Sequence, residues 1–127
     1  MINKLNGTTI KYSGNGRKLG YPTANFAVNS DVADGVYISF STLNFSKLKG
    51  QKLPSMTFIG VPTTVGDTQR RVEVHIFDIA DMDYYDCEIE TELIHKIRDN
   101  KTFNSVDELL GVMKTDERIA REYFRNA

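Results

Sequence analysis

The change of hydrophobic period near Ser105 constrains the fold of this 127-residue chain more than any other feature. Before it, residues 71–79 and 86–98 alternate apolar with polar side chains, which is the pattern of half-buried antiparallel strands. After it, apolar residues recur at helical spacing, and Ser105 with Glu108 three residues later forms a capping box for a helix. The chain is therefore expected to be mainly β, with a single helix at its C-terminal end.

Three further segments, residues 5–12, 35–41 and 53–59, are rich in strand-forming residues and bounded by turn residues. Several strands followed by one amphipathic helix indicate a small β-barrel or β-sandwich with the helix packed on it. The length suits one hydrophobic core, and no repeat or linker divides the sequence. We therefore expect a single domain over residues 1–127.

The composition excludes several classes of protein. Sixteen Lys and Arg against seventeen Asp and Glu give a net charge of -1, so no global basic field attracts nucleic acid or membrane. No apolar run reaches membrane-spanning length, and the N-terminal residues lack a signal peptide. The single Cys87 excludes an internal disulfide framework and is typical of a reducing cytosol. We expect a cytoplasmic monomer that binds neither nucleic acid nor membranes.

The strongest candidate for a ligand site is the glycine-rich segment that begins at residue 14. Gly14, Gly16 and Gly20 let backbone N–H groups approach an anion closely. Arg17 and Lys18, between these glycines, complement the charge of an anion. From local chemistry alone, however, a glycine-rich loop most often only joins two strands.

Thr23 and Asn25 follow this loop in a segment that Pro22 holds extended. Alternation along an extended segment places their side-chain oxygens on one face. Magnesium prefers such hard oxygen ligands, few in number, with phosphates and water in the remaining positions. The segment is therefore a candidate site for a metal-bound nucleotide, although the usual Gly-rich nucleotide motifs are absent from the sequence.

Many short motifs of the sequence follow one another in a characteristic order along the chain. They are residues 14–20, 22–25, 35–37, 59–63, 72–76, 83–85 and 97–98, with Lys101, Phe103, Asp116 and Ala120. In these blocks the sequence resembles the flavokinase (riboflavin kinase) domain. A single block could match by chance, whereas this many in one order make the resemblance specific. It implies a small six-stranded antiparallel Greek-key β-barrel with a C-terminal α-helix, in agreement with the pattern above.

The resemblance implies transfer of the γ-phosphate of ATP to the ribityl 5′-hydroxyl of riboflavin, giving FMN and ADP, with Mg²⁺ or another divalent cation. Thr23 and Asn25 match the ligands of the metal and the phosphates. Glu73 matches the general base that takes the proton from the 5′-hydroxyl. An alkyl hydroxyl is a poor nucleophile at neutral pH, so a carboxylate within hydrogen-bond reach suits this chemistry.

The resemblance also implies further contacts to each substrate. A flat isoalloxazine ring needs an aromatic or apolar face and a few polar groups that orient it. The implied nucleotide contacts, beyond the glycine-rich loop, are Ile76, Asp78 and Tyr85, and the implied flavin contacts are Arg98, Lys101 and Phe103.

The chain departs from the family pattern at three positions. Tyr12 and Asp86 stand where the family usually has glycine, and Asn100 stands where an acidic residue usually follows Arg98 by two positions. Aspartate tolerates a positive φ better than most residues. The departures concern the loops around the substrates rather than Glu73. The chain also has no room for the adenylyltransferase module of many bacterial relatives, so FAD synthesis is not expected from it.

Two alternatives to a kinase remain open. The substituted glycines are compatible with a flavin-binding or regulatory module that has kept the barrel and lost turnover, although the presence of Glu73, Thr23 and Asn25 opposes it. An oligonucleotide-binding barrel would need clustered basic and aromatic residues, and the near-neutral charge opposes that.

Two histidines and three carboxylates could be mistaken for metal ligands. His75 is expected to pack or to form a hydrogen bond, and His95 has no companion at metal-ligand spacing. Glu88, Glu90 and Glu92 alternate along one strand, where solvent screens like charges. We therefore expect a solvated strand face rather than a metal cluster.

Overall fold

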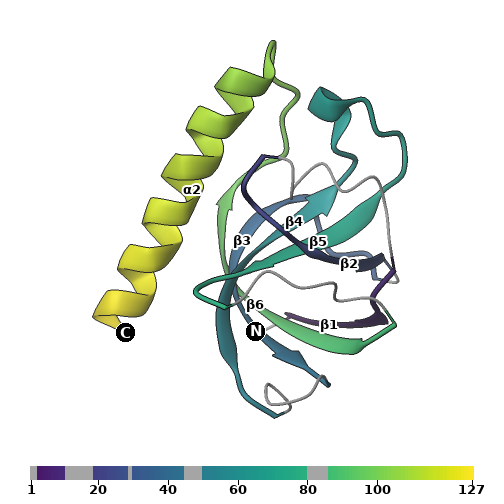
Figure 1. Cartoon of the computed structure of the whole chain (residues 1–127), viewed down its shortest axis with the longest axis vertical. Helices are drawn as coiled ribbons and strands as arrows, with labels where there is room; N and C mark the ends of the chain where they lie inside the picture. The colour runs from purple at the N-terminus through teal and green to yellow at the C-terminus, as the bar shows by residue number, and fades with distance from the viewer. Residues whose placement is uncertain (1–2, 11–18, 29, 45–49, 80–85) are drawn as a thin grey trace.

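The computed structural model describes residues 3–10, 19–28, 30–44, 50–79 and 86–127. They form six strands, one turn of 3₁₀ helix (η2) and one long α-helix (Figure 1). Along the chain these elements are β1 (Asn3–Thr8), β2 (Ala24–Ala27), β3 (Gly35–Leu43), β4 (Leu53–Gly60), η2 (Thr63–Val65), β5 (Arg71–Ile76), β6 (Glu88–Arg98) and α2 (Val106–Asn126).

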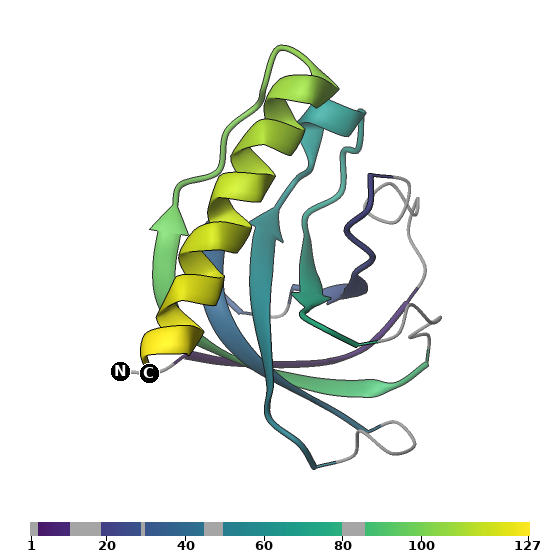
Figure 2. The ribbon, with the colours of Figure 1, turned by 60° about the vertical axis from the view of Figure 1, so that its left-hand side comes forward.

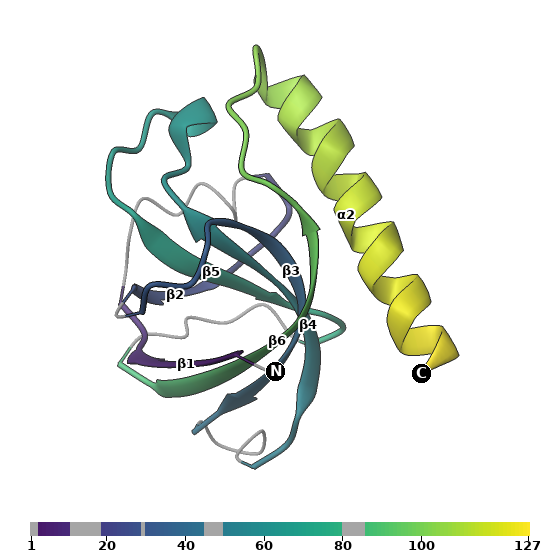
Figure 3. The same ribbon diagram turned by 180° about the vertical axis from the view of Figure 1, so that it is seen from behind.

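The strands form one antiparallel sheet in the order β1-β6-β3-β4-β5-β2. The sheet curls until its two edge strands, β1 and β2, lie on the same side of the molecule (Figure 3). There Ile10 N–H donates to the carbonyl oxygen of Asn25 at 2.8 Å, just beyond the end of β1. The result is a nearly closed barrel, so the predicted six-stranded barrel with a C-terminal helix is confirmed.

The strands predicted at residues 35–41 and 53–59 are confirmed as β3 and β4. The prediction of a strand over residues 71–79 is wrong at its C-terminal end, because β5 stops at Ile76. Two residues later Asp78 has a φ of 60°, a left-handed conformation through which a strand does not continue.

The first and last strands also differ from their predicted bounds. β1 starts and ends earlier than the predicted segment 5–12, of which residues 11 and 12 lie outside the described residues. β6 starts at Glu88 rather than at Asp86, which has a φ of 58°. Asp86 thus has a positive φ at a position where the family usually has glycine. This agrees with the tolerance of aspartate for that conformation.

The helix α2 starts where the sequence predicts. Ser105 is its N-cap, and the Ser105 hydroxyl accepts a hydrogen bond from Glu108 N–H at 3.1 Å. α2 lies along the outside of the barrel (Figure 2), with Ala120 fully buried against the barrel. In the part of the chain that the structure describes, no helix is both long and apolar enough to cross a membrane.

Alternation along the strands divides the apolar residues between two clusters. On β5, Val72, Val74 and Ile76 point into the barrel, and Glu73 and His75 point outward. The barrel interior cluster holds Leu5, Ala24, Phe26, Tyr37, Leu43, Ile59, Val72, Val74, Ile76, Ile89 and Leu93. The seam between the outer face of the sheet and α2 holds Tyr21, Ile38, Met56, Phe77 and Ala120, with Leu110, Met113, Tyr123 and Phe124 partly buried against them.

The barrel interior also contains five fully buried hydroxyl groups on β3, β4 and β6. The hydroxyl of Ser39 lies 2.7 Å from that of Ser55 and 2.8 Å from that of Thr57. The hydroxyl of Ser41 lies 3.0 Å from those of Ser55 and Thr91. Each hydroxyl therefore has a hydrogen-bond partner, which offsets the cost of burying a polar group.

Candidate active site

A pocket opens at the end of the seam nearer the start of α2. Its walls come from the outward faces of β4 and β5, from η2, from the connection between β6 and α2, and from α2 itself. Five residues predicted to contact substrate or metal or to act in catalysis line this pocket: Thr23, Glu73, Arg98, Lys101 and Phe103.

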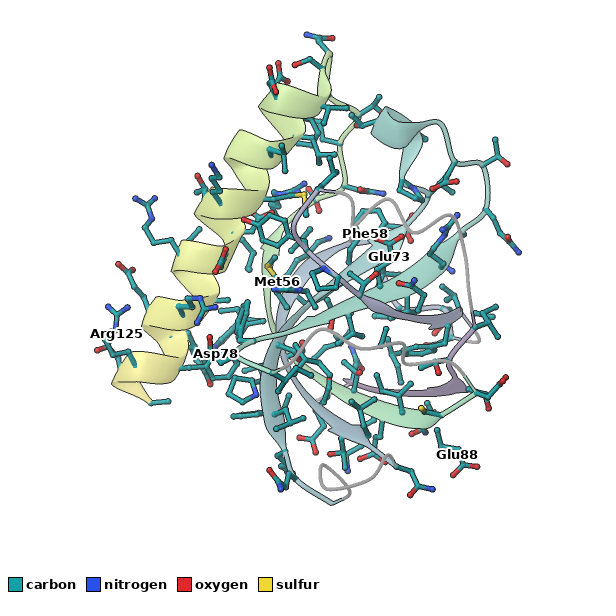
Figure 4. The ribbon with its side chains drawn as sticks, in the orientation of Figure 1. Met56, Phe58, Glu73, Asp78, Glu88 and Arg125 are labelled. Atoms are coloured by element: carbon teal, nitrogen blue, oxygen red, sulfur yellow. The ribbon has the colours of Figure 1, made fainter. Side chains whose placement is uncertain are left out.

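Glu73 points into the pocket from the middle of β5. Its backbone pairs with Asn25 of β2 on one side and with Phe58 of β4 on the other (Figure 4). Only 21% of its side chain is exposed, and this burial raises the pKa of Glu73 to about 6. The Arg71 guanidinium, 3.7 Å from the Glu73 carboxylate, lowers the pKa in part, and Asp67 raises it. Glu73 is thus a carboxylate whose pKa lies close to neutral pH, as a general base requires.

Thr23 and Asn25 lie beside this carboxylate. The Thr23 hydroxyl donates to Asn25 Oδ1 at 2.6 Å, so both side-chain oxygens lie on one side of the segment, as alternation predicts. Asn25 is directly opposite Glu73 in the register of β2 and β5. Three hard oxygen donors therefore come from adjacent positions, a set that suits Mg²⁺ with few protein ligands.

The segment before Thr23 is fixed by His75 of β5. The ring nitrogen Nδ1 of His75 lies 2.8 Å from the carbonyl oxygen of Pro22 and, since a carbonyl only accepts, donates to it. The Tyr21 ring packs edge-on against the His75 ring, with centroids 5.2 Å apart. Gly20, with a φ of 88°, lets the chain turn just before Tyr21. His75 thus forms packing contacts and a hydrogen bond, as predicted.

Another part of the pocket lining is an aromatic ring with two cations near it. Phe103 is buried, and its backbone N–H donates to the Thr64 hydroxyl at 2.9 Å. The Arg98 guanidinium carbon lies 5.5 Å from the centre of the Phe103 ring, and Lys101 Nζ lies 5.4 Å from it. Arg98 is also bound to Asp116 of α2. An apolar face with convergent polar groups is typical of a site for a flat, partly polar ligand.

The family model for riboflavin kinase (Flavokinase) matches residues 3–124 of the chain. The chain belongs to the flavokinase family. The bifunctional riboflavin kinase/FMN adenylyltransferase of Escherichia coli K12 is 38% identical to it over 111 residues, which are 86% of this chain. The chain spans 34% of the length of that curated relative.

Two solved structures share this flavokinase fold. One, described as riboflavin kinase from Trypanosoma brucei, matches with a TM-score of 0.69 at 21% identity, over 98% of this chain and 78% of that one. Another, described as a macrolide-efflux protein from Streptococcus pneumoniae, matches with a TM-score of 0.76 at 32% identity, over 93% of this chain and 38% of that one. Both matches include the barrel and its C-terminal helix.

Thr23 lines the pocket, but the two other described residues of its segment that the flavokinase resemblance implies as nucleotide contacts, Gly20 and Asn25, do not. Seven more implied contacts lie elsewhere in the fold or outside the described residues. Ile76 is buried inside the barrel, and Asp78 is exposed in the turn after β5, beside α2 (Figure 4). Their contact with nucleotide stays a prediction. The remaining five are in the part of the chain that the structure does not describe: Gly14, Gly16, Arg17, Lys18 and Tyr85.

Several pocket residues have no role in the sequence-based prediction. Asp116 belongs to the flavokinase motif but comes from α2, and only the folded chain brings it to Arg98. Asn100 lies against Gly60, where a Cβ would clash with the Asn100 amide. Phe58 enters the pocket wall because its register on β4 places it beside Glu73. Register between distant strands is not readable from local patterns, so no signal in the sequence identifies Phe58.

The glutamates of β6 lie away from this site, with Glu88 exposed at the far end of the barrel (Figure 4). Glu92 Oε1 lies 3.0 Å from Lys52 Nζ and 3.9 Å from Lys4 Nζ. Glu90 Oε1 lies 3.8 Å from the same Lys4 ammonium. Glu88 is thus exposed, as predicted for a solvated strand face, whereas the Glu92 side chain is only 12% exposed and is paired with lysines.

Proposed function

We propose that this flavokinase-family chain is a riboflavin kinase, which transfers the γ-phosphate of ATP to the ribityl 5′-hydroxyl of riboflavin and releases FMN and ADP. The observation that carries the proposal is the position of Glu73, which is only 21% exposed and pairs with Asn25, in a pocket that Phe103 also lines. No observation on the described residues favours a module that has lost turnover.

Riboflavin binding would use the aromatic wall of the pocket. The isoalloxazine ring would pack near Phe103, with Arg98 and Lys101 as polar contacts. The ribityl chain would then extend toward β5, so that its 5′-hydroxyl reaches the Glu73 carboxylate. Aromatic contact area would supply much of the affinity, and the cations would fix the orientation of the ring.

Thr23 and Asn25 would hold Mg²⁺ together with the phosphates of ATP. When bound, the ion neutralises charge on the phosphates during the transfer. The glycine-rich loop, with Gly14, Gly16 and Gly20, would bind the phosphates through backbone N–H groups. Arg17 or Lys18 would add a positive charge there.

In the chemical step Glu73 would take the proton of the 5′-hydroxyl as the hydroxyl oxygen bonds to the γ-phosphorus. The bond between that phosphorus and the β,γ-bridging oxygen breaks, ADP leaves, and Glu73 later loses the proton to solvent. Phosphoryl transfer has a loose transition state with charge on the equatorial oxygens, so the protein contributes chiefly through positioning and electrostatic stabilisation.

Incubation of the purified chain with riboflavin, ATP and Mg²⁺, followed by chromatography for FMN, tests the proposal. We expect FMN only when all three are present. Riboflavin binding without any FMN would instead support the regulatory module.

The metal ligands are tested with Thr23→Ala, which should require roughly tenfold more Mg²⁺ for half-maximal activity, since it removes one of few protein ligands. Thr23→Ser keeps the hydroxyl and is the matched control. An Mg²⁺ titration curve unchanged by Thr23→Ala would contradict the assignment of Thr23.

We further propose that the chain works as a monomer in the cytoplasm and does not bind nucleic acid. The net charge of -1 opposes binding to nucleic acid, and the single, buried Cys87 is typical of a reducing cytosol. Sedimentation at working concentration, alone and with RNA, tests the monomer and the absence of nucleic-acid binding, and a sedimentation coefficient that rises with RNA would contradict the latter.

A further inference from the structure

Two consecutive residues of α2 contact two different residues of the pocket lining. Successive residues of an α-helix point roughly 100° apart, so neighbours reach different partners. Asp116 binds Arg98, at the end of β6 on the aromatic side of the pocket. Glu117 binds Tyr21, which precedes Thr23 by two residues.

The Asp116 contact fixes the plane of the Arg98 guanidinium. Arg98 Nε lies 3.0 Å from each oxygen of the Asp116 carboxylate, and Arg98 Nη2 lies 3.0 Å from Oδ2. The Asp116 side chain is only 3% exposed. Because the guanidinium is rigid and planar, a carboxylate that binds two of its nitrogens sets the direction of the whole group. The same guanidinium faces the ring of Phe103, so Asp116 holds it at the aromatic wall.

The Glu117 contact fixes the start of the segment that leads to Thr23. The Tyr21 hydroxyl donates to Glu117 Oε1 at 3.0 Å, and the Tyr21 side chain is buried. Only Pro22, whose ring fixes φ, separates Tyr21 from Thr23. The contact of Tyr21 with Glu117 of α2 therefore strongly limits where the Thr23 hydroxyl can lie.

Glu117 is itself held in place from the other side. Arg121 Nε donates to Glu117 Oε2 at 2.8 Å, so both oxygens of the carboxylate accept hydrogen bonds. Arg121 Nη1 lies 3.1 Å from both oxygens of Asp78, and its guanidinium carbon lies 4.5 Å from the centre of the Phe77 ring. The chain of contacts thus runs from Tyr21 through α2 to the turn after β5.

We propose that α2 is a brace with two arms, in which Asp116 positions Arg98 for riboflavin and Glu117 positions the Tyr21–Thr23 segment for metal-bound ATP. This inference rests on the proposed function. Both are positioning residues, since each acts through another residue. Two substrates react only when their groups are aligned, and a displacement of about 1 Å can cost roughly a hundredfold in rate. One rigid helix that contacts both sides keeps the two sites in a fixed relation.

Steady-state kinetics on two nearly isosteric variants test the two arms separately. Asp116→Asn should raise KM for riboflavin roughly tenfold and leave KM for ATP within about twofold, since it weakens a contact to one substrate site only. Glu117→Gln should raise KM for ATP roughly tenfold and leave KM for riboflavin within about twofold, since it weakens a contact to the other substrate site. Glu122→Gln makes the same chemical change on the exposed face of α2, and we expect both KM values to be unchanged.

A merely structural role predicts a different result. In that case both KM values would change together in each variant. Alternatively, neither KM value would change in a variant that melts at the wild-type temperature. Either result would overturn the brace. Tyr21→Phe removes only the hydroxyl of the second arm, so Tyr21→Phe with Glu117→Gln should raise KM for ATP no more than Glu117→Gln alone. If Asp116→Asn does not fold, Asp116→Glu, which keeps the charge and displaces it, tests the first arm.

Failure of the proposed function gives a separate signal. If the wild-type chain forms no FMN, that function is wrong, and equilibrium titration then tests the brace. Riboflavin fluorescence should show weaker binding to Asp116→Asn only, and titration with Mg²⁺ and ATP should show weaker binding to Glu117→Gln only. Equal losses of both ligands in each variant would overturn the brace.

Discussion

The inside of the barrel and the seam beneath α2 are built by opposite faces of the same strands, yet they differ in chemistry. The interior holds aliphatic and aromatic side chains with hydroxyls that bond one another. The seam holds edge-on aromatic pairs, ion pairs and the pocket. The interior hydroxyls on β3, β4 and β6 have one another as hydrogen-bond partners, whereas α2 supplies carboxylate partners to Arg98 and Tyr21 in the seam. The interior therefore maintains the fold, and the outward face is available for chemistry.

The largest effect is expected from a substitution in the seam that removes a reacting group and leaves the barrel interior unchanged. Glu73→Gln should lower kcat by roughly 10²–10⁴-fold, the usual loss when a general base is removed. Riboflavin should still bind, because Glu73 is not part of the aromatic wall. Single-turnover kinetics with a flavin-binding titration check both statements. Turnover close to that of the wild type would contradict the role of Glu73.

Phe26→Ala makes the converse change, in the interior alone. Phe26 is 0% exposed, so its truncation should lower the free energy of unfolding by about 3–5 kcal/mol, through lost burial and the cavity left behind. Denaturant unfolding measures this loss. Phe124→Ala in the seam, where the ring is only partly buried, is the matched control and should cost less. An equal loss in both would remove the distinction between the two regions.

The raised pKa of Glu73 predicts a cost in stability that depends on pH. Its pKa is about 6 in the folded chain against an ordinary 4.5, so folding favours the protonated form. The folded state binds more protons between these values, and stability falls as the pH rises through them. Glu73→Gln should therefore be more stable than the wild type at pH 7, by at most about 2 kcal/mol. Thermal melts from pH 7 down to pH 4.5 should show that the stability difference between Glu73→Gln and the wild type becomes small near pH 4.5.

The smallest effect concerns the buried hydroxyls. Thr57→Val keeps the shape and removes one hydrogen bond to Ser39, whose hydroxyl still has Ser55 as a partner. The free energy of unfolding should fall by about 1 kcal/mol. Thr23→Val, outside the barrel interior, should change stability less and activity more. A stability loss from Thr57→Val as large as that from Phe26→Ala would show that the hydroxyl network, not apolar packing, holds the interior together.

Local patterns in the sequence predict much of the fold. The alternation around Val72 and Val74 and the Ser105 cap give the mainly β chain with its final helix, because each depends on neighbours along the chain. The pattern fails at Asp78, whose left-handed backbone ends β5 and breaks the alternation.

The site is less predictable, because its members meet through contacts between distant residues. The flavokinase motifs single out Thr23, Glu73 and Phe103, and the structure gathers these three around one pocket. The bond from Asp116 to Arg98 joins a helix to a strand end, and no local period encodes it. Tyr21 and Glu117 are 96 residues apart, so only the packing of α2 on the barrel reveals their contact.

The pairing of Asn25 with Glu73 also limits which changes in chain length the protein can accept. β2 is only four residues long, and side chains alternate between its two faces. A single inserted or deleted residue within β2 would turn Asn25 toward the interior and bring an apolar neighbour to the pocket. Insertions in the connection between β2 and β3 leave this pairing intact. Variation in length among functional homologues should therefore concentrate in that connection and be absent from residues 23–27.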